Sequence, residues 1–270
     1  MPFVESAGYR VYYEEHGSGD AILFVGGITV DHTGFGLQVE PLSRRHRVIV
    51  YDNPGVGQTI GPAGPFTTAL LAEVAGGLLE ALDAGPAHIV GVSMGGAIAQ
   101  ELAIDHAASV RSALLHCTWG RADAFMVALF RSWQAIARDT PDILDRYRAF
   151  WPWVFTPAFY AAPGALAAAE ELTAANPFPQ SLQGFLDQAE ACIAHDALDR
   201  VGAIGAPTLI AAGEDDLLVP PRHSFALHER MPGALLHLWR GMGHAPWVEI
   251  PEAFNRLVEV WVDGAAADRS

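Results

Sequence analysis

Residues Gly91-Val92-Ser93-Met94-Gly95-Gly96 place a serine between glycines, at the point where an apolar segment meets a predicted helix. Residues 88–92 predict a buried strand, and residues 94–106 predict a helix. A G-x-S-x-G sequence in this context predicts a strained turn that lifts the Ser93 hydroxyl above the sheet, near the positive end of the helix dipole. Glycines at 91 and 95 fit such a turn, because the neighbouring backbone comes too close for a Cβ atom. Short motifs also arise by chance in a chain with 27 glycines, so the rest of the chain must decide whether Ser93 is a nucleophile.

Short apolar runs recur along the chain and alternate with helical patterns. Strands buried on both faces are predicted at residues 21–25, 47–51, 88–92, 110–116 and 207–212, and a last strand is predicted at residues 234–239. Helices are predicted at residues 68–84, 94–106 and 254–262, and an N-terminal hairpin at residues 3–5 and 9–15. Strands that alternate with helices predict an α/β fold, with a mostly parallel central sheet flanked by helices on both faces.

One long segment interrupts this alternation. The strands predicted at residues 110–116 and 207–212 are separated by far more chain than one crossover helix requires. The intervening residues are rich in aromatic side chains, and prolines at 141, 152, 157, 163, 177 and 179 divide them into short predicted helices. We therefore expect a core domain of residues 1–118 and 195–270, with a helical cap of residues 119–194 inserted over one edge of the sheet.

Two further polar groups follow predicted strands. The acidic loop with Asp215 and Asp216 comes after the strand at 207–212, and His244 follows the last predicted strand. A serine hydroxyl is a weak nucleophile at neutral pH, so it needs a basic histidine, and the histidine needs a carboxylate that orients it. The chain order serine, aspartate, histidine is typical of α/β-hydrolases.

Nearly the whole chain resembles the α/β-hydrolase superfamily, in particular its serine hydrolases with a helical lid. Beyond the G-x-S-x-G turn, the matching features are Phe24-Val25-Gly26-Gly27, the D-x-x-G-x-G turn at residues 52–57, the G-x-x-D loop followed by Pro220, and the G-x-G-H sequence ending at His244. Residues 91–103 are similar to the 3-oxoadipate enol-lactonase-like and esterase group, and residues 215–220 are similar to aminoacrylate hydrolases. The resemblance implies a triad of Ser93, His244 and Asp216, since the G-x-x-D spacing favours Asp216 over its neighbour Asp215.

The same resemblance implies an oxyanion hole formed by the backbone N–H groups of Met94 and Ile28. Many members carry His-Gly at the end of the strand before this loop, whereas this chain has Gly26-Gly27. The histidine is not itself a donor, so its replacement does not abolish the oxyanion hole. The loop that carries Ile28 is nevertheless expected to differ in shape or mobility.

The substrate pocket is expected to be closed and largely apolar, because the cap is rich in aromatic residues and such side chains line most ligand pockets. The candidate pocket residues are Gly27, Trp119, Trp133, Trp151, Trp153 and Trp247. Such a pocket favours a compact hydrophobic or cyclic acyl group over a polymer. His32 and His116 lie near the predicted cleft, and we interpret them as structural, with substrate contact as the alternative.

These features predict a hydrolase of small to medium carboxylic esters or lactones that works through an acyl-enzyme, without a cofactor or a metal. Hydrolysis of carbon–carbon bonds in ring-fission products is an alternative, although Gly26-Gly27-Ile28-Thr29 and Ala245 depart from the sequences usual in that group. A hydrolase-like protein that binds its ligand and turns over slowly is the other alternative. The expected partner is a small-molecule substrate.

The composition argues against several other classes of function. A formal net charge of −15 repels phosphate backbones, so nucleic acid is not an expected partner. No apolar run approaches the roughly 20 residues of a membrane span, and the N-terminal residues lack a signal-peptide pattern, so we expect a cytoplasmic protein without membrane contact. Cys117 and Cys192 form no C-x-x-C motif and are interpreted as buried thiols. A homo-oligomer remains open.

Overall fold

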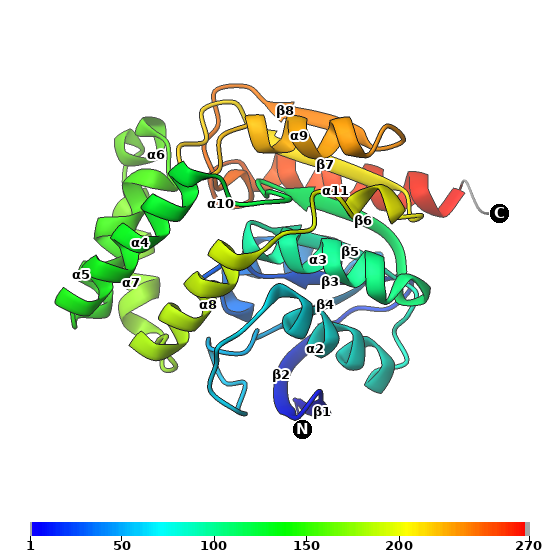
Figure 1. The fold of residues 1–270 in the computed structure, drawn as a ribbon, viewed down its shortest axis with the longest axis horizontal. Helices are drawn as coiled ribbons and strands as arrows, with labels where there is room; N and C mark the ends of the chain where they lie inside the picture. Colours follow the sequence, from blue (N-terminus) through cyan, green and yellow to red (C-terminus); the bar gives the residue numbers. More distant parts are fainter. Residues whose placement is uncertain (1, 268–270) are drawn as a thin grey trace.

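The computed structural model describes residues 2–267 and contains one eight-stranded sheet (Figure 1). The strands are β1 (Phe3–Ser6), β2 (Tyr9–His16), β3 (Ala21–Val25), β4 (Arg47–Tyr51), β5 (Ala87–Val92), β6 (Val110–His116), β7 (Thr208–Gly213) and β8 (Leu235–Trp239). Each predicted strand differs from the observed one by at most one residue at either end. The apolar runs therefore predicted the strands well.

The strands follow the order β1-β2-β4-β3-β5-β6-β7-β8 across the sheet. Strands β1 and β2 form the expected antiparallel hairpin, and β2 pairs antiparallel with β4. All later neighbours are parallel, with Leu23 of β3 paired to Ile49 of β4 on one side and to Ile89 of β5 on the other. The prediction of a mostly parallel sheet is confirmed. Parallel strands bring their carboxyl ends to one edge, where ligands bind in open α/β sheets.

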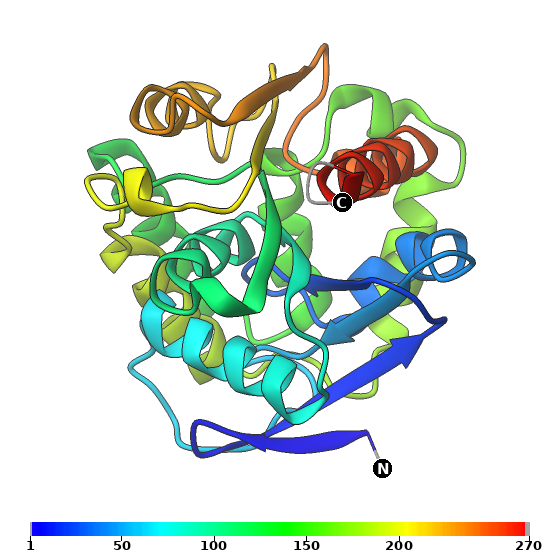
Figure 2. The same ribbon diagram turned by 90° about the vertical axis from the view of Figure 1, so that its right-hand side faces the viewer.

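Successive residues of the central strand β3 point into two different apolar layers. Ile22 and Phe24 belong to one buried cluster, and Leu23 and Val25 belong to the other. On the first face the sheet is covered by α1 (Gly36–Leu42), α10 (Pro246–Glu249) and α11 (Pro251–Ala267). On the second face it is covered by α2 (Thr68–Ala81), α3 (Met94–Asp105) and α9 (Arg222–Arg230). Figure 2 shows the sheet between these two layers.

Helix α2 ends three residues before the predicted end at residue 84. The chain leaves the helix at Leu82 and turns at Asp83, whose φ angle of 47° is left-handed and cannot continue an α-helix. Helix α11 is longer than the predicted 254–262, because its amphipathic pattern starts directly at Pro251. Proline is well suited to the first turn of a helix.

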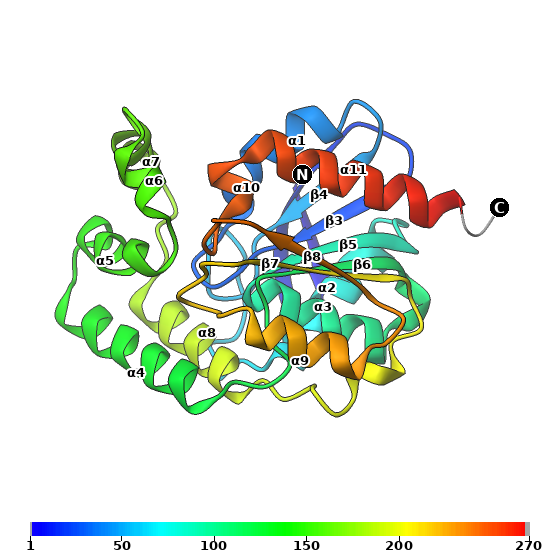
Figure 3. The same cartoon turned by 90° about the horizontal axis from the view of Figure 1, so that it is seen from above.

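In the sequence, a group of helices follows β6 and precedes β7. In space, these helices lie beyond one end of the sheet (Figure 3). We call them the cap helices: α4 (Ala124–Asp139), α5 (Ile143–Phe150), the 3₁₀ turn η3 (Trp151–Trp153), α6 (Pro157–Ala161), α7 (Ala165–Ala175) and α8 (Leu182–Ala194). Most begin at a side chain that caps the first turn, such as Asp123 for α4 and Ser181 for α8. The domain boundaries at 118/119 and 194/195 stay a prediction.

The two ends of the cap segment meet at its base. The N–H groups of Ala197 and Leu198 both donate to the carbonyl of Gly120, at 2.7 and 3.0 Å. Arg121 reinforces this contact through an exposed ion pair with Asp196 at 2.8 Å. The segment thus leaves and rejoins the sheet at neighbouring points. Within residues 2–267, none of the helices has the length and apolar character needed to cross a membrane.

Candidate active site

Ser93 stands at the sharp turn between β5 and α3. Its φ and ψ angles are 58° and −120°, a conformation that non-glycine residues rarely adopt. Space around it is limited, because a Cβ atom at Gly91 would lie 2.4 Å from the Gly95 carbonyl oxygen, and one at Gly95 would lie 1.9 Å from the Val25 carbonyl oxygen. Thr118 donates its hydroxyl to the Ser93 carbonyl at 2.8 Å. The turn therefore has the strained geometry that the flanking glycines predicted.

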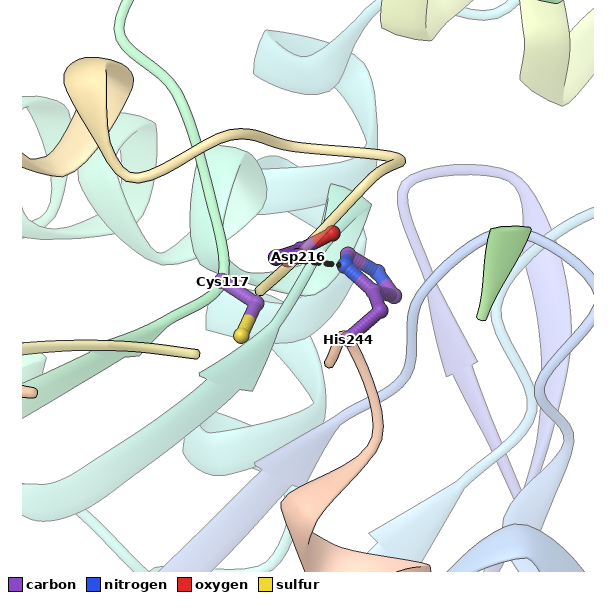
Figure 4. A group of neighbouring side chains, drawn as sticks. All are labelled: Cys117, Asp216 and His244. Atoms are coloured by element: carbon purple, nitrogen blue, oxygen red, sulfur yellow. Dashed lines mark hydrogen bonds and ion pairs between the residues drawn. The ribbon is translucent and has the colours of Figure 1, made fainter. Parts of the chain in front are cut away.

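His244 lies in the loop after β8, beside Asp216 of the loop after β7. Its Nδ1 atom is 2.7 Å from Oδ2 of Asp216, and both side chains are buried (Figure 4). The backbone N–H of His244 donates to the carbonyl of Val154, which follows η3 in the cap segment, at 3.0 Å. Since the Asp216 carboxylate accepts a hydrogen bond from Nδ1–H, the lone pair of the neutral ring is left on Nε2.

The Asp216 carboxylate is held by the backbone of its own loop. Oδ1 accepts hydrogen bonds from the N–H groups of Leu218 and Val219, at 2.9 and 2.8 Å. The neighbouring Asp215 is exposed, and its backbone N–H donates to the Met242 carbonyl at 2.9 Å. The structure therefore pairs Asp216, and not Asp215, with His244.

Cys117 lies beside this pair (Figure 4). Each of the three residues has one atom that could bind a metal ion, and these atoms lie within 4.8 Å of one another. Burial, together with the charge of Asp216, raises the pKa of the Cys117 thiol well above its usual value. A neutral thiol is a poor metal ligand, and both carboxylate oxygens of Asp216 already accept hydrogen bonds. The second group with this spacing is Asp31, His32 and Asp52, where His32 Nδ1 is 2.8 Å from Asp52. In each group the histidine is paired with one carboxylate, whereas Cys117 bonds to His116 and Asp31 bonds to Thr33 and Asn176.

The two candidate oxyanion donors flank Ser93. Met94 is the first residue of α3, and Ile28 lies in the loop after β3. Among residues 2–267, neither backbone N–H has a hydrogen-bond acceptor, as is usual for Met94 at the first position of a helix. Gly27 lies against Ser93, since a Cβ atom there would be 3.0 Å from Cβ of Ser93. The carbonyl of Gly26 accepts a hydrogen bond from Asn53 at 3.1 Å.

Ser93 and His244 both line a small cavity of about 70 Å³. The other lining residues are mostly apolar and come from the loop after β3, the cap segment and the segments that follow β7 and β8: Gly27, Ile28, Thr29, Val30, Trp133, Tyr147, Phe150, Trp151, Val154, Leu218 and Trp247. Trp133 stacks on Phe150 with ring centroids 4.4 Å apart. The buried indole N–H of Trp133 has no acceptor within the described residues. A larger cavity of about 430 Å³ shares Thr29, Tyr147, Trp151 and Trp247 with the small one.

Two of the six candidate pocket residues lie elsewhere. Trp119 is fully buried at the base of the cap segment, where it packs on Phe130 and on His195. Trp153 lines a separate surface cavity with Asp215. Neither residue lines the small cavity beside Ser93, because Trp119 fills the base of the cap and Trp153 lines a different cavity. Gly27, Trp133, Trp151 and Trp247 line the small cavity.

Tyr147, Phe150, Val154 and Leu218 line the cavity without having been predicted to do so. Phe150 was recognisable as one of many cap aromatics, but nothing in the sequence distinguishes those that face the cavity. His116 is fully buried against Trp247 and Phe254 and does not line the cavity.

The comparison with known sequences agrees with the fold. The sequence model of the α/β-hydrolase fold family matches residues 20–249, which is most of the chain. The chain therefore belongs to the α/β-hydrolase fold family, and the prediction of this fold is confirmed.

The names of individual relatives support hydrolase activity but differ from one another, so they fix no substrate. A putative carbamate hydrolase, RutD of Azorhizobium caulinodans, is 32% identical over 96% of this chain and 97% of its own length. The enol-lactonase of Burkholderia xenovorans has a similar structure, with a TM-score of 0.87, 25% identity and coverage of 97% of this chain and 100% of its own. The putative non-heme bromoperoxidase BpoC of Mycobacterium tuberculosis has a TM-score of 0.86 at 26% identity, covering 95% of this chain and 96% of its own.

Proposed function

We propose that this chain is a serine hydrolase that cleaves small to medium carboxylic esters or lactones, with Ser93 as nucleophile, His244 as base and Asp216 as the group that orients the base. The observation that carries the proposal is that Ser93 and His244 line one small apolar cavity while His244 is bonded to a buried carboxylate at 2.7 Å. A buried pair of this kind next to a strained serine is difficult to explain by stability alone.

The proposed mechanism follows from the hydrogen bonds of His244. Nε2 takes the proton of the Ser93 hydroxyl while Oγ attacks the substrate carbonyl, and the imidazolium is stabilised by Asp216. The backbone N–H groups of Met94 and Ile28 would then stabilise the oxyanion of the tetrahedral intermediate. His244 returns the proton to the leaving alcohol, and an acyl-enzyme remains on Ser93. Water then repeats the sequence and releases the acid.

The dimensions of the cavity support a small acyl group. A cavity of about 70 Å³ has room for only a few non-hydrogen atoms, whereas the adjoining cavity of about 430 Å³ suits the alcohol part and the way in. A substrate oxygen on the acyl side would also give the Trp133 indole N–H an acceptor. These features favour compact, oxygen-bearing acyl groups over long chains.

Carbamate hydrolysis is a second candidate, because a relative with 32% identity is named a putative carbamate hydrolase. A carbamate carbonyl would be attacked by the same serine and would leave a carbamoyl-enzyme. The carbamate nitrogen takes the place of the carbon that is attached to the carbonyl in an ester's acyl group, and it would lie in the small cavity. The substrate test therefore includes carbamates with the same leaving group as the esters.

The test combines active-site labelling with a substrate panel. We expect a fluorophosphonate probe to label Ser93 in the folded protein, and Ser93→Ala to lose both labelling and on the order of 10⁴-fold or more in kcat. The panel contains p-nitrophenyl esters of graded acyl length, lactones and p-nitrophenyl carbamates. Activity should be highest for short acyl groups. Near-normal turnover by Ser93→Ala would refute the mechanism.

One matched pair of substrates tests the Trp133 contact. p-Nitrophenyl methoxyacetate and butyrate have acyl groups of similar size, but only the first carries an extra oxygen. The kcat/KM for methoxyacetate divided by that for butyrate should be lower in Trp133→Phe than in the wild type. If the probe labels Ser93 but the unlabelled protein is inactive on every ester, lactone and carbamate, this would instead favour carbon–carbon bond hydrolysis or a slow ligand-binding protein.

A further inference from the structure

The loop that carries Ile28 is held in a strained conformation at the next residue. Thr29 has a φ angle of 69°, in the left-handed region that β-branched residues rarely adopt. The N–H of Val30 donates to the carbonyl of Gly27 at 3.2 Å, which closes a four-residue turn with Thr29 at its third position. A type II turn requires a positive φ at this position and usually has glycine there. A strained residue persists only where the surrounding structure holds it.

Two side chains of the cap helices hold both peptide groups of Thr29. The N–H of Thr29 donates to Oε1 of Gln188 at 3.3 Å, and the hydroxyl of Tyr147 donates to the Thr29 carbonyl at 3.4 Å. Gln188 belongs to α8 and Tyr147 to α5. Rotation of either peptide would break one of these hydrogen bonds, so the direction of the loop backbone depends on the cap helices.

The side chain of Gln188 is itself fixed. It is fully buried, its Nε2 donates to the Pro54 carbonyl at 2.9 Å, and its Oε1 also accepts from Gln180 Nε2 at 2.9 Å. A carbonyl can only accept and a backbone N–H can only donate, so the amide nitrogen must face Pro54 and the oxygen must face Thr29. Gln188 thereby connects the loop after β3 to the D-x-x-G-x-G turn.

Helix α8 comes close enough for this contact because two glycines meet. A Cβ atom at Gly184 would lie 2.2 Å from the carbonyl oxygen of Gly55, so any larger residue would push the helix away. Gly184 precedes Gln188 by four residues, and residues at this spacing share one face of a helix. The glycine contact therefore places Gln188 within hydrogen-bond distance of Thr29.

We propose that Gln188 is a positioning residue of the oxyanion hole. It holds the Thr29 peptide, and through it the N–H of Ile28, in the direction of the reacting carbonyl. The inference rests on the proposed function, because it assigns the N–H of Ile28 to the oxyanion. In this chain Gly26 follows β3, where many family members have a histidine. The proposal names what constrains the loop here, which is its contact with α8.

Gln188→Met tests the proposal, because methionine keeps the length of the side chain and loses both hydrogen-bonding groups. We expect kcat to fall by about 10-fold or more with little change in KM, since the lost contact acts on the transition state. Affinity for a trifluoromethyl ketone, which forms an anionic hemiketal with the serine, should fall by a similar factor. Gln188→Glu keeps an acceptor for the Thr29 N–H and should recover part of kcat.

Gln183→Met is the matched control, because Gln183 lies on the same helix, is exposed and bonds to Asp187. It should leave kcat and inhibitor affinity unchanged. Hydrogen exchange at the Thr29 amide gives a readout that does not depend on activity, and it should accelerate in Gln188→Met but not in Gln183→Met. If Gln188→Met fails to fold, Tyr147→Phe removes the other of these two hydrogen bonds to Thr29. Because Tyr147 also lines the cavity, its readout is the hydrogen exchange of the Thr29 amide, which should accelerate.

Wild-type values of kcat, inhibitor affinity and Thr29 exchange in Gln188→Met would overturn the proposal, as would an equal loss in Gln183→Met. In the fallback case, an unchanged Thr29 exchange rate in Tyr147→Phe would overturn it. Failure of the proposed function gives a different result, because Ser93→Ala would then retain turnover whatever the Gln188 variants do. An inactive Ser93→Ala beside a fully active Gln188→Met would refute the positioning role alone.

Discussion

At the scale of single residues, Asp215 and Asp216 are adjacent and chemically identical, but the loop gives them different surroundings. Asp216 is buried with hydrogen bonds to both oxygens, whereas Asp215 is exposed at a surface cavity. We expect Asp216→Asn to lower kcat by about 10³- to 10⁴-fold, because an amide cannot hold the same tautomer of His244. Asp215→Asn should change kcat by less than about three-fold. Steady-state kinetics with one p-nitrophenyl ester measures both, and the reverse order would assign the acid to Asp215.

How far the sequence predicts the site also differs from residue to residue. Ser93, Asp216 and His244 each lie within three residues of a glycine after a predicted strand, and these local signals do not depend on the cap. Gln188 carried no such signal, because a glutamine in a helix is ordinarily exposed. Its role becomes visible only when α8 is placed against Thr29 and Pro54.

At the scale of the elements, strands and cap helices were predictable to different degrees. Strands β3, β4 and β6 match the predicted residues because a strand buried on both faces is a continuous apolar run. The rotation of the cap helices about their axes is set by long-range packing. The sequence alone therefore does not distinguish Trp119, which fills the base of the cap, from Trp133, which lines the cavity.

The contact between α8 and the turn at residues 52–57 leads to a prediction for Gly184→Ala. The added Cβ atom would lie 2.2 Å from the backbone oxygen of Gly55, so α8 or the turn at residues 52–57 must shift. We expect a loss of about 1–3 kcal/mol in the free energy of unfolding, as for other overpacked sites, together with a lower kcat. Urea unfolding and kinetics measure the two effects. Gly164→Ala is not a suitable control, because Gly164 has a φ angle of 80°.

Gly205→Ala provides the control, since a Cβ atom at Gly205 has no neighbour within 4 Å and its φ angle lies outside the left-handed region. Its stability and kcat should stay close to those of the wild type. Equal stability of Gly184→Ala and Gly205→Ala would mean that α8 accommodates the methyl group without moving.

At the scale of the whole molecule, three buried histidines make the fold sensitive to acid. Burial and the charge of Arg111 lower the pKa of His88 to about 4, burial and the charge of His244 lower that of His116 to about 3, and burial and the charge of Arg200 lower that of His195 to about 4. Unfolded histidine has a pKa of about 6.5. The unfolded chain therefore binds more protons below that pH.

The free energy of unfolding should consequently fall as the pH decreases from about 6.5 to about 4, by up to about 1.4 kcal/mol per pH unit for each of these histidines. Above about pH 6.5 their contribution is constant, because they are neutral in both states. His88→Asn retains a polar atom for Ser112, which lies 2.7 Å from Nδ1 of His88, and should reduce the slope by about one proton. Urea unfolding at a series of pH values measures this slope, with the partly exposed His16→Asn as control. An unchanged slope in His88→Asn would show that His88 is protonated in the folded state.

The burial of the two cysteines has a consequence for following the molecule in solution. Cys117 lies in the core beside Asp216, Cys192 lies in α8, and both are fully buried. Burial raises the pKa of each thiol, so neither reacts until its surroundings open. A variant that keeps only Cys117 would report on opening of the core beside Asp216, and a variant that keeps only Cys192 would report on opening at α8. A faster reaction of Cys192 than of Cys117 with a disulfide reagent would show that α8 detaches while the core remains folded.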